Sequence, residues 1–172
     1  VRYVVAAAAL TALCLALGAS WPKEPAAVRH ALLSGVLLHA VYLGGVWWAV
    51  RKGLPAGISG LIAALQPILT AFLAPVLVGE RISASRWLGI GLGFAGIALV
   101  LSPKLAGVAP DALQAVLWPL AINAIAMLSV TLGTFYQKRF IATGDLRTVT
   151  VLQYLGALAV TLPVAWATDE MR

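Results

Sequence analysis

The sequence predicts an all-α integral membrane protein with six transmembrane helices. Of its 172 residues, 62% are hydrophobic and only 10% are charged, whereas a soluble domain carries about 25% charged residues. A charge at the centre of a bilayer costs roughly 2.5–3.5 kcal/mol on insertion scales. All charged residues fall outside six apolar runs, which cover residues 3–22, 31–50, 53–79, 87–103, 112–137 and 148–168.

Aromatic and basic residues mark the ends of these runs. Tryptophan favours the membrane–water interface, and all six tryptophans lie near run ends: Trp21, Trp47, Trp48, Trp87, Trp118 and Trp166. The run 87–103 is shorter than the roughly 20 residues that cross a bilayer core. Arg86 and Lys104 flank it, and long basic side chains can reach outward to the interface. We therefore count it as a sixth span.

The first two expected helices cover residues 3–20 and 31–50. The second contains His39 and Tyr42, which are three residues apart and therefore share a face. Two interpretations of His39 stay open: a histidine bonded to a neighbouring helix, or a group in a pocket or proton relay. The six runs contain no Asp or Glu, so the intramembrane carboxylate of many proton-coupled pumps is missing from them.

The third run carries Gln66 and Pro67 near its middle. Proline inside a helix removes one backbone hydrogen bond and crowds the carbonyl four residues earlier. In a membrane, such a defect is tolerated only where protein buries it or a water-filled cavity adjoins it. Ser59, Gln66 and Thr70 share one face because they are spaced by seven and four. We expect a polar cavity beside Gln66; a kink filled by packed side chains is the alternative.

The last three expected helices carry small or uncharged polar residues on one side. Gly89 and Gly93 form a GxxxG pair, which lets a neighbouring backbone approach closely. Polar stripes in transmembrane helices normally face the bundle interior, as interhelical contacts or as the wall of a pocket. The fifth and sixth helices each carry such a stripe: Asn123, Met127, Thr131 and Thr134, and Thr150, Gln153, Tyr154 and Thr161.

The charge balance favours a lipid partner over a nucleic acid. The net charge is +6, but the basic residues are spread in ones and twos over the loops, as membrane anchors are. Lys and Arg number seven in the loops after the first, third and fifth helices and five on the other side. The positive-inside rule therefore places the first set in the cytoplasm. Cys14 is the one cysteine, so we expect no internal disulfide and no cysteine-based metal site. The sequence implies no metal and no cofactor.

Two short motifs raise enzymatic alternatives. Residues 91–96 match GxGxxG, but a dinucleotide site needs a preceding strand, so here the pattern indicates helix packing. Residues 57–60 match the GxSG of rhomboid-like intramembrane proteases, with Ser59 as the nucleophile. That nucleophile needs a base within reach; in that family the histidine follows the serine, whereas His30 and His39 precede it. A serine protease and a structural membrane protein without a solute remain the alternatives.

Several short segments of the sequence are similar to those of a known transporter family: residues 65–70 (LQPILT), 77–83 (LVGERIS), 87–89 (WLG), 93–96 (GFAG) and 131–139 (TLGTFYQKR). On these segments the chain resembles the EamA-like family of drug/metabolite transporters. Arg2-Tyr3 is also similar to the Arg-aromatic pair that opens the second helix of that family, and Gln153 falls where its seventh helix often has Gln.

The resemblance implies ten helices in two inverted five-helix repeats, of which this chain would supply helices two to seven. Residues 1–103 would form the first repeat without its first helix, and residues 104–172 the first two helices of the second repeat. It also implies a multi-pass permease or exporter of the inner membrane, not an enzyme. Such a protein carries amino acids or related small metabolites by alternating access around a midplane cavity. The oligomeric state stays open.

We expect seven side chains to bind the solute or line this cavity. Gln66 would hydrogen-bond the solute and Pro67 would supply the local break, and the remaining candidates are Thr70, His39, Tyr42, Asn123 and Gln153.

Overall fold

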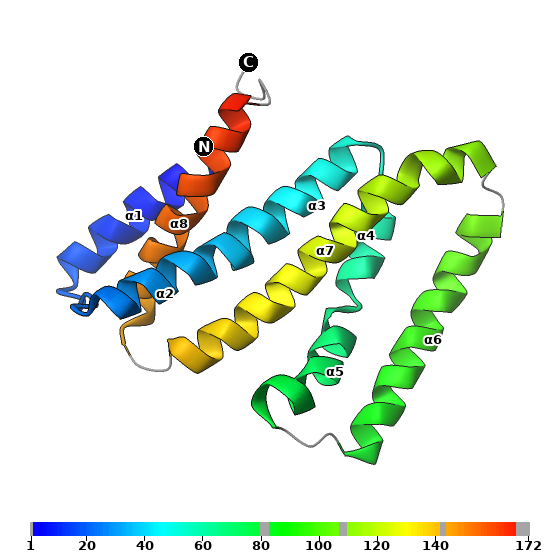
Figure 1. The fold of residues 1–172 in the computed structure, drawn as a ribbon, viewed down its shortest axis with the longest axis horizontal. Coiled ribbons are helices and arrows are strands. Elements are labelled where there is room, and N and C mark those ends of the chain that lie inside the picture. The colour runs from blue at the N-terminus through cyan, green and yellow to red at the C-terminus, as the bar shows by residue number, and fades with distance from the viewer. Residues whose placement is uncertain (1, 80–82, 107–109, 142–143, 168–172) are drawn as a thin grey trace. The chain divides into compact units, whose positions relative to one another are not determined.

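The computed structural model describes residues 2–79, 83–106, 110–141 and 144–167, and over these residues it is built of helices without a strand (Figure 1). The helices are α1 (Arg2–Ala16), α2 (Pro25–Gly35), the π-helical segment η1 (Val36–Val41), α3 (Tyr42–Arg51), α4 (Ala56–Ala63), α5 (Gln66–Val78), α6 (Ala84–Ala106), α7 (Pro110–Phe140) and α8 (Leu146–Ala167).

Four helical stretches of the described chain are long and apolar enough to cross a membrane: Pro25–Arg51, Ala56–Val78, Leu117–Phe140 and Leu146–Ala167. The apolar helices Arg2–Ala16 and Ala84–Val100 are shorter. At 1.5 Å per residue, α1 reaches about 22 Å, less than the roughly 30 Å of a bilayer core. The all-helical class is confirmed, and crossing by the first and fourth expected helices stays a prediction.

Two observed helix ends differ from the expected ones, and the backbone conformation explains both. The first helix ends at Ala16 rather than Ser20, because Gly18 adopts φ +61°. The N–H of Ala19 then donates to Cys14 O at 2.9 Å and that of Gly18 to Leu15 O at 3.3 Å, the bond pattern of a Schellman motif. The second helix begins earlier than expected, at Pro25, because proline suits the first turn of a helix, where its missing N–H has no partner to lose.

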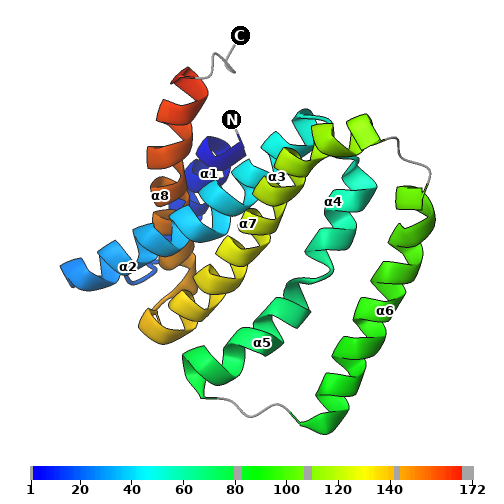
Figure 2. The ribbon, with the colours of Figure 1, turned by 45° about the vertical axis from the view of Figure 1, so that its right-hand side comes forward.

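The chain divides into two compact units, residues 1–44 with 132–172, and residues 45–131. In the first unit α8 lies beside α1, α2 and η1, as both ribbon views show (Figures 1 and 2). Many of the buried side chains of these helices are small, including Ala7, Ala31 and Ala157. Small residues let helix backbones approach closely, which is how transmembrane helices gain packing energy in lipid.

The closest approach in the first unit is between α2 and α8. A Cβ atom on Gly35 would overlap the backbone carbonyl oxygen of Gln153, and one on Gly156 would overlap that of Leu32. Within the described part of the chain, a Cβ on Gly89 or Gly93 would meet nothing within 4 Å. The described residues therefore do not bear out the close approach expected at this GxxxG pair.

The second unit contains α4, α5, α6 and most of α7. Phe72 of α5 packs edge-on against Trp87 of α6, with ring centroids 4.8 Å apart. Gly45 lies against Ala126 of α7, and Leu54 is buried beyond the end of α3. This unit carries the interrupted helix that the sequence predicts.

Candidate functional site

The predicted interruption of the third span lies between α4 and α5 (Figure 2). Helix α4 ends at Ala63, a turn follows, and α5 begins at Gln66 with Pro67 in its first turn. Pro67 therefore occupies a position where its missing N–H is tolerated. The sequence prediction of a break at Gln66-Pro67 is confirmed, since the structure has two helices, α4 and α5, on either side of it.

The break withdraws the usual donors from two backbone carbonyl groups. Pro67 has no N–H to offer Ala63. The N–H of Ile68 donates to Leu65 O at 3.0 Å, so it does not serve Ala64 as in a continuous helix. In a membrane, carbonyl groups at such breaks need protein or water around them, and in several transporters they bind ions at the membrane midplane.

The side chains beside the break differ in what they can still bind. Gln66 and Thr70 are half-buried and Pro67 is exposed. The Thr70 hydroxyl donates to Gln66 O at 2.9 Å, so its proton is used within α5. The Gln66 amide makes no hydrogen bond within the described part of the chain. Among the side chains beside the break, it therefore still has free donors and acceptors.

Asn123 of α7 lies in the core of the second unit. Its side chain is fully buried, and its Oδ1 accepts a 3.2 Å hydrogen bond from the Ser59 hydroxyl of α4. Its Nδ2 has no partner in the described structure. A buried amide group without a partner carries a desolvation cost of about 1–3 kcal/mol, so it is a position where a bound group would gain a hydrogen bond.

The fifth-helix stripe is confirmed in part. Asn123, Met127 and Thr131 are buried, whereas Thr134 is exposed. The protease alternative gains no support from Ser59, because its partner is an amide oxygen, and an amide cannot take a proton as a general base.

Gln153 of α8 belongs to a polar network in the first unit. Its Nε2 donates to Ser34 Oγ at 3.0 Å and to Gln137 Oε1 at 3.1 Å, so both of its N–H bonds are used. Ser34 in turn donates to Ala31 O at 2.8 Å. The network joins α2, α7 and α8 beside the Gly35 contact. Gln153 was predicted from the sequence as a site residue, but Ser34 and Gln137 were not. Single uncharged polar residues are common in apolar helices, so these two did not stand out.

His39 lies in the π-helical segment η1 of the same unit, which no sequence pattern indicated. Its ring centroid is 5.0 Å from that of Tyr154 in α8 and 6.1 Å from that of Tyr3 in α1, and the two tyrosine centroids are 6.0 Å apart. The Tyr3 hydroxyl donates to His39 O at 2.9 Å. Tyr42, the first residue of α3, is half-buried. We call Tyr3, His39 and Tyr154 the aromatic cluster.

A second polar region lies where α2 and α8 begin. His30 Nδ1 and the Tyr136 hydroxyl are 2.6 Å apart, and the His30 ring stacks on Phe140 at 4.7 Å. A cavity of about 360 Å³ borders His30, Phe140 and Asp145.

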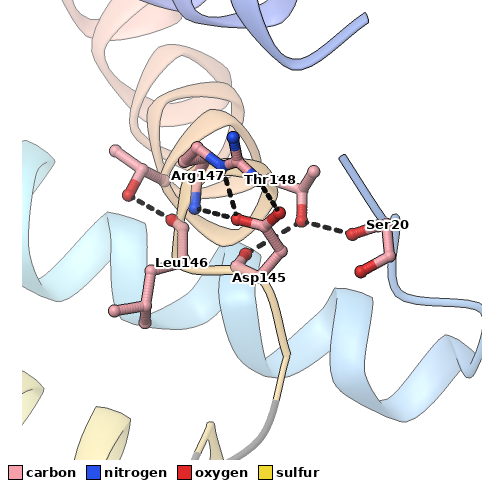
Figure 3. Close-up of polar contacts among 6 residues, drawn as sticks. Ser20, Asp145, Leu146, Arg147 and Thr148 are labelled. Carbon is pink, nitrogen blue, oxygen red and sulfur yellow. Dashed lines mark hydrogen bonds and ion pairs between the residues drawn. The ribbon is translucent and has the colours of Figure 1, made fainter. Parts of the chain in front are cut away.

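Asp145 caps α8, as Figure 3 shows, and it borders this cavity. Its Oδ1 accepts 2.9 and 3.0 Å hydrogen bonds from the side chain and backbone of Arg147. These bonds hold the pKa of the Asp145 carboxyl below its usual value. The Thr148 hydroxyl lies 2.9 Å from both Ser20 O and Asp145 O, which ties the α1–α2 loop to the start of α8.

The expected site residues fall into two groups. His39, Tyr42 and Gln153 lie in the first unit, and Gln66, Pro67, Thr70 and Asn123 in the second. Within the first unit the structure adds Tyr3 and Tyr154 beside His39. Both tyrosines were noted in the sequence: Tyr154 lies in the polar stripe of the sixth expected helix, and Tyr3 in the Arg-aromatic pair. The contact among the three rings could not be predicted, because no local sequence pattern indicates it.

These features define a helical protein with several stretches able to cross a membrane and with uncharged polar groups inside its helices. The model of the EamA-like transporter family matches residues 1–102. The chain belongs to this family, and the resemblance drawn from its sequence is confirmed.

Two relatives support the assignment. The chain is 30% identical over 139 residues to the uncharacterized inner membrane transporter YedA of Escherichia coli K12, a match that covers 81% of this chain and 42% of YedA. It is 32% identical over 84 residues to the probable 4-amino-4-deoxy-L-arabinose-phosphoundecaprenol flippase subunit ArnE of Pectobacterium atrosepticum, covering 46% of this chain and 74% of ArnE. The chain thus spans about two-fifths of YedA. No solved structure gives a significant match.

Proposed function

We propose that this protein acts in the transport of small organic metabolites, such as amino acids or related solutes, across the inner membrane. Membership of the EamA-like family supports this function, as does the name of the relative YedA as a transporter. The mechanism we propose is alternating access around a midplane cavity, with the ten-helix inverted-repeat arrangement of the full-length protein.

The observation that carries this proposal is the interrupted helix α4–α5. The break leaves the carbonyl groups of Ala63 and Ala64 without their usual donors, beside the unused amide of Gln66. An interrupted helix with free polar groups at membrane depth is characteristic of transporter binding sites. Gln66 would hydrogen-bond the solute, and Pro67 would keep the break open.

The other candidate residues would either contact the solute or shape the site around it. Asn123 would offer its unpaired Nδ2 to an acceptor on the solute, and His39 and Tyr42 would line the wall. Thr70 and Gln153 have committed hydrogen bonds, so they would shape the site more than bind within it.

The test is transport in proteoliposomes that contain the purified Gln66→Leu variant. Leucine keeps the volume and helix propensity of the side chain but removes its hydrogen bonds, so uptake or export should fall about tenfold, the loss of one to two hydrogen bonds. Val76→Leu on the same helix, at a position 80% exposed, is the control and should transport as the parent does. Unchanged transport by Gln66→Leu, with unaltered thermal unfolding, would remove Gln66 from the site.

A further inference from the structure

The aromatic cluster of the first unit has the chemistry of a binding site for an organic anion. Tyr3, His39 and Tyr154 come from three different elements, α1, η1 and α8, yet their ring centroids all lie within 6.1 Å of one another. All three residues are half-buried. The cluster therefore presents ring surface to whatever adjoins it instead of being sealed in the core.

Two hydrogen-bond donors of the cluster are unused within the described part of the chain. The Tyr3 proton is given to His39 O. Within the described part of the chain, neither the Tyr154 hydroxyl nor the His39 imidazole forms a hydrogen bond. A phenol and a neutral imidazole can each donate one bond, so the cluster offers two donors to an incoming acceptor.

The charge next to the cluster is positive. The Arg2 guanidinium stacks over the Tyr3 ring, 5.2 Å from its centroid, and Arg2 is exposed. The helices that build the cluster, α1, α2 with η1, and α8, contain no Asp or Glu in their sequences. A carboxylate would meet Arg2 and two donors. An ammonium group could use the acceptor lone pairs of Tyr154 and His39 and the ring faces, but the positive charge of Arg2 would repel it.

An apolar groove continues from the cluster. It has a volume of about 330 Å³ and is lined by Tyr154 and by Ala6, Ala9, Leu10 and Leu13 of α1. Tyr3, Ala6, Leu10 and Leu13 follow one another at helical spacing, so they lie on one face of α1. Tyr154 borders both the groove and the cluster, which places an apolar surface beside the polar donors.

We propose that Arg2, His39 and Tyr154 bind the carboxylate of a small amphipathic organic anion whose apolar body lies along the groove of α1. The assignment deepens the proposed transport function by naming a solute class. Its first test, however, is binding and does not depend on transport.

The binding test compares three ligands of one shape in calorimetric titrations of the purified protein in detergent micelles. 3-Phenylpropionate carries the carboxylate, 3-phenylpropionamide is its neutral counterpart, and 2-phenylethylamine carries the opposite charge. The carboxylate should bind about fivefold or more tightly than the amide, the scale of one charge-assisted hydrogen bond, and the amine should bind most weakly. Equal affinity for carboxylate and amine would overturn the proposal.

Variants locate the site. Arg2→Gln should weaken carboxylate binding about fivefold or more while leaving binding of the amide within twofold, because it removes the positive charge. Tyr154→Phe should weaken binding of both ligands, because the amide oxygen accepts the same hydrogen bond as the carboxylate. Lys52→Gln is the matched control, since Lys52 is also stacked on an aromatic ring, that of Trp48, at 5.9 Å. Carboxylate binding that survives Arg2→Gln, or that falls equally in Lys52→Gln, would overturn the assignment.

Transport in proteoliposomes then separates this inference from the proposed function. Movement of 2-phenylethylamine but not of 3-phenylpropionate would refute the anion site and leave the transporter standing. Arg2-dependent binding of the carboxylate with no transport of any of the three solutes would support the site and count against transport.

Discussion

At the scale of single residues, Asn123 holds a buried N–H group that nothing in the described structure satisfies. The hydrogen bond from Ser59 to its Oδ1 fixes the amide in place and directs the unpaired Nδ2 away from that contact. A purely structural asparagine would gain little from such an arrangement, since burying an amide is favourable only when its bonds are made. In the proposed site, this unpaired Nδ2 would donate to an acceptor on the solute, alongside the amide of Gln66.

Replacing Asn123 separates binding from packing. Asn123→Leu keeps the volume and removes the unpaired N–H, but it also leaves the buried Ser59 hydroxyl without its acceptor. These two effects oppose each other, so the free energy of unfolding should change by no more than about 1 kcal/mol, while transport should fall several-fold. Thermal unfolding followed by circular dichroism and flux in proteoliposomes are the two measurements.

Ser59→Ala provides the comparison for Asn123→Leu. It leaves the amide in place with its Oδ1 also unpaired, so it should destabilise the protein by about 1–3 kcal/mol. If Asn123→Leu keeps both stability and full transport, the amide has no part in solute binding.

At the scale of helices, two glycines decide how α2 and α8 pack. A Cβ on Gly35 or Gly156 would overlap backbone atoms of the facing helix, and a backbone cannot move aside as a side-chain end can. Overpacked sites of this kind typically cost 1–3 kcal/mol. The polar network of Ser34, Gln137 and Gln153 crosses the same contact, so the glycines also hold that network in register.

Gly156→Ala should therefore lower the free energy of unfolding by about 1–3 kcal/mol, measured by denaturant titration in detergent. Gly89→Ala is the matched control, because a Cβ there meets nothing within 4 Å. Alanine exceeds glycine in helix propensity by up to about 1 kcal/mol, so the control should be neutral or stabilising. Equal effects at the two positions would contradict the close packing of α2 and α8.

At the scale of the whole molecule, helix length and the distribution of basic residues predict which helices cross the membrane and in which direction. Four stretches meet the length requirement over the described chain, whereas α1 has 15 residues. The distribution of Lys and Arg predicts that the loops after the first, third and fifth expected helices are cytoplasmic. Residues on either side of Pro25–Arg51 should then lie on opposite sides.

Cysteine labelling tests this topology. In a Cys14→Ser background, which removes the one cysteine, Lys23→Cys and Ser83→Cys should react with a membrane-impermeant maleimide only after the cells are opened. Lys52→Cys should react in intact spheroplasts. Labelling of Lys23→Cys and Lys52→Cys from the same side would show that the stretch between them does not cross the membrane.

The sequence by itself determined the class of the protein and the break in the third span, and its resemblance to the EamA-like segments indicated the family. The class and the break follow from local costs: a charge in lipid is expensive wherever it falls, and a proline lacks its N–H in any fold. The sequence did not show that Gly35 and Gly156, rather than Gly89 and Gly93, make close contacts within the described chain, or that Tyr3, His39 and Tyr154 meet. Those outcomes depend on how each helix is rotated about its axis, and only the packing of segments distant in the chain sets that rotation.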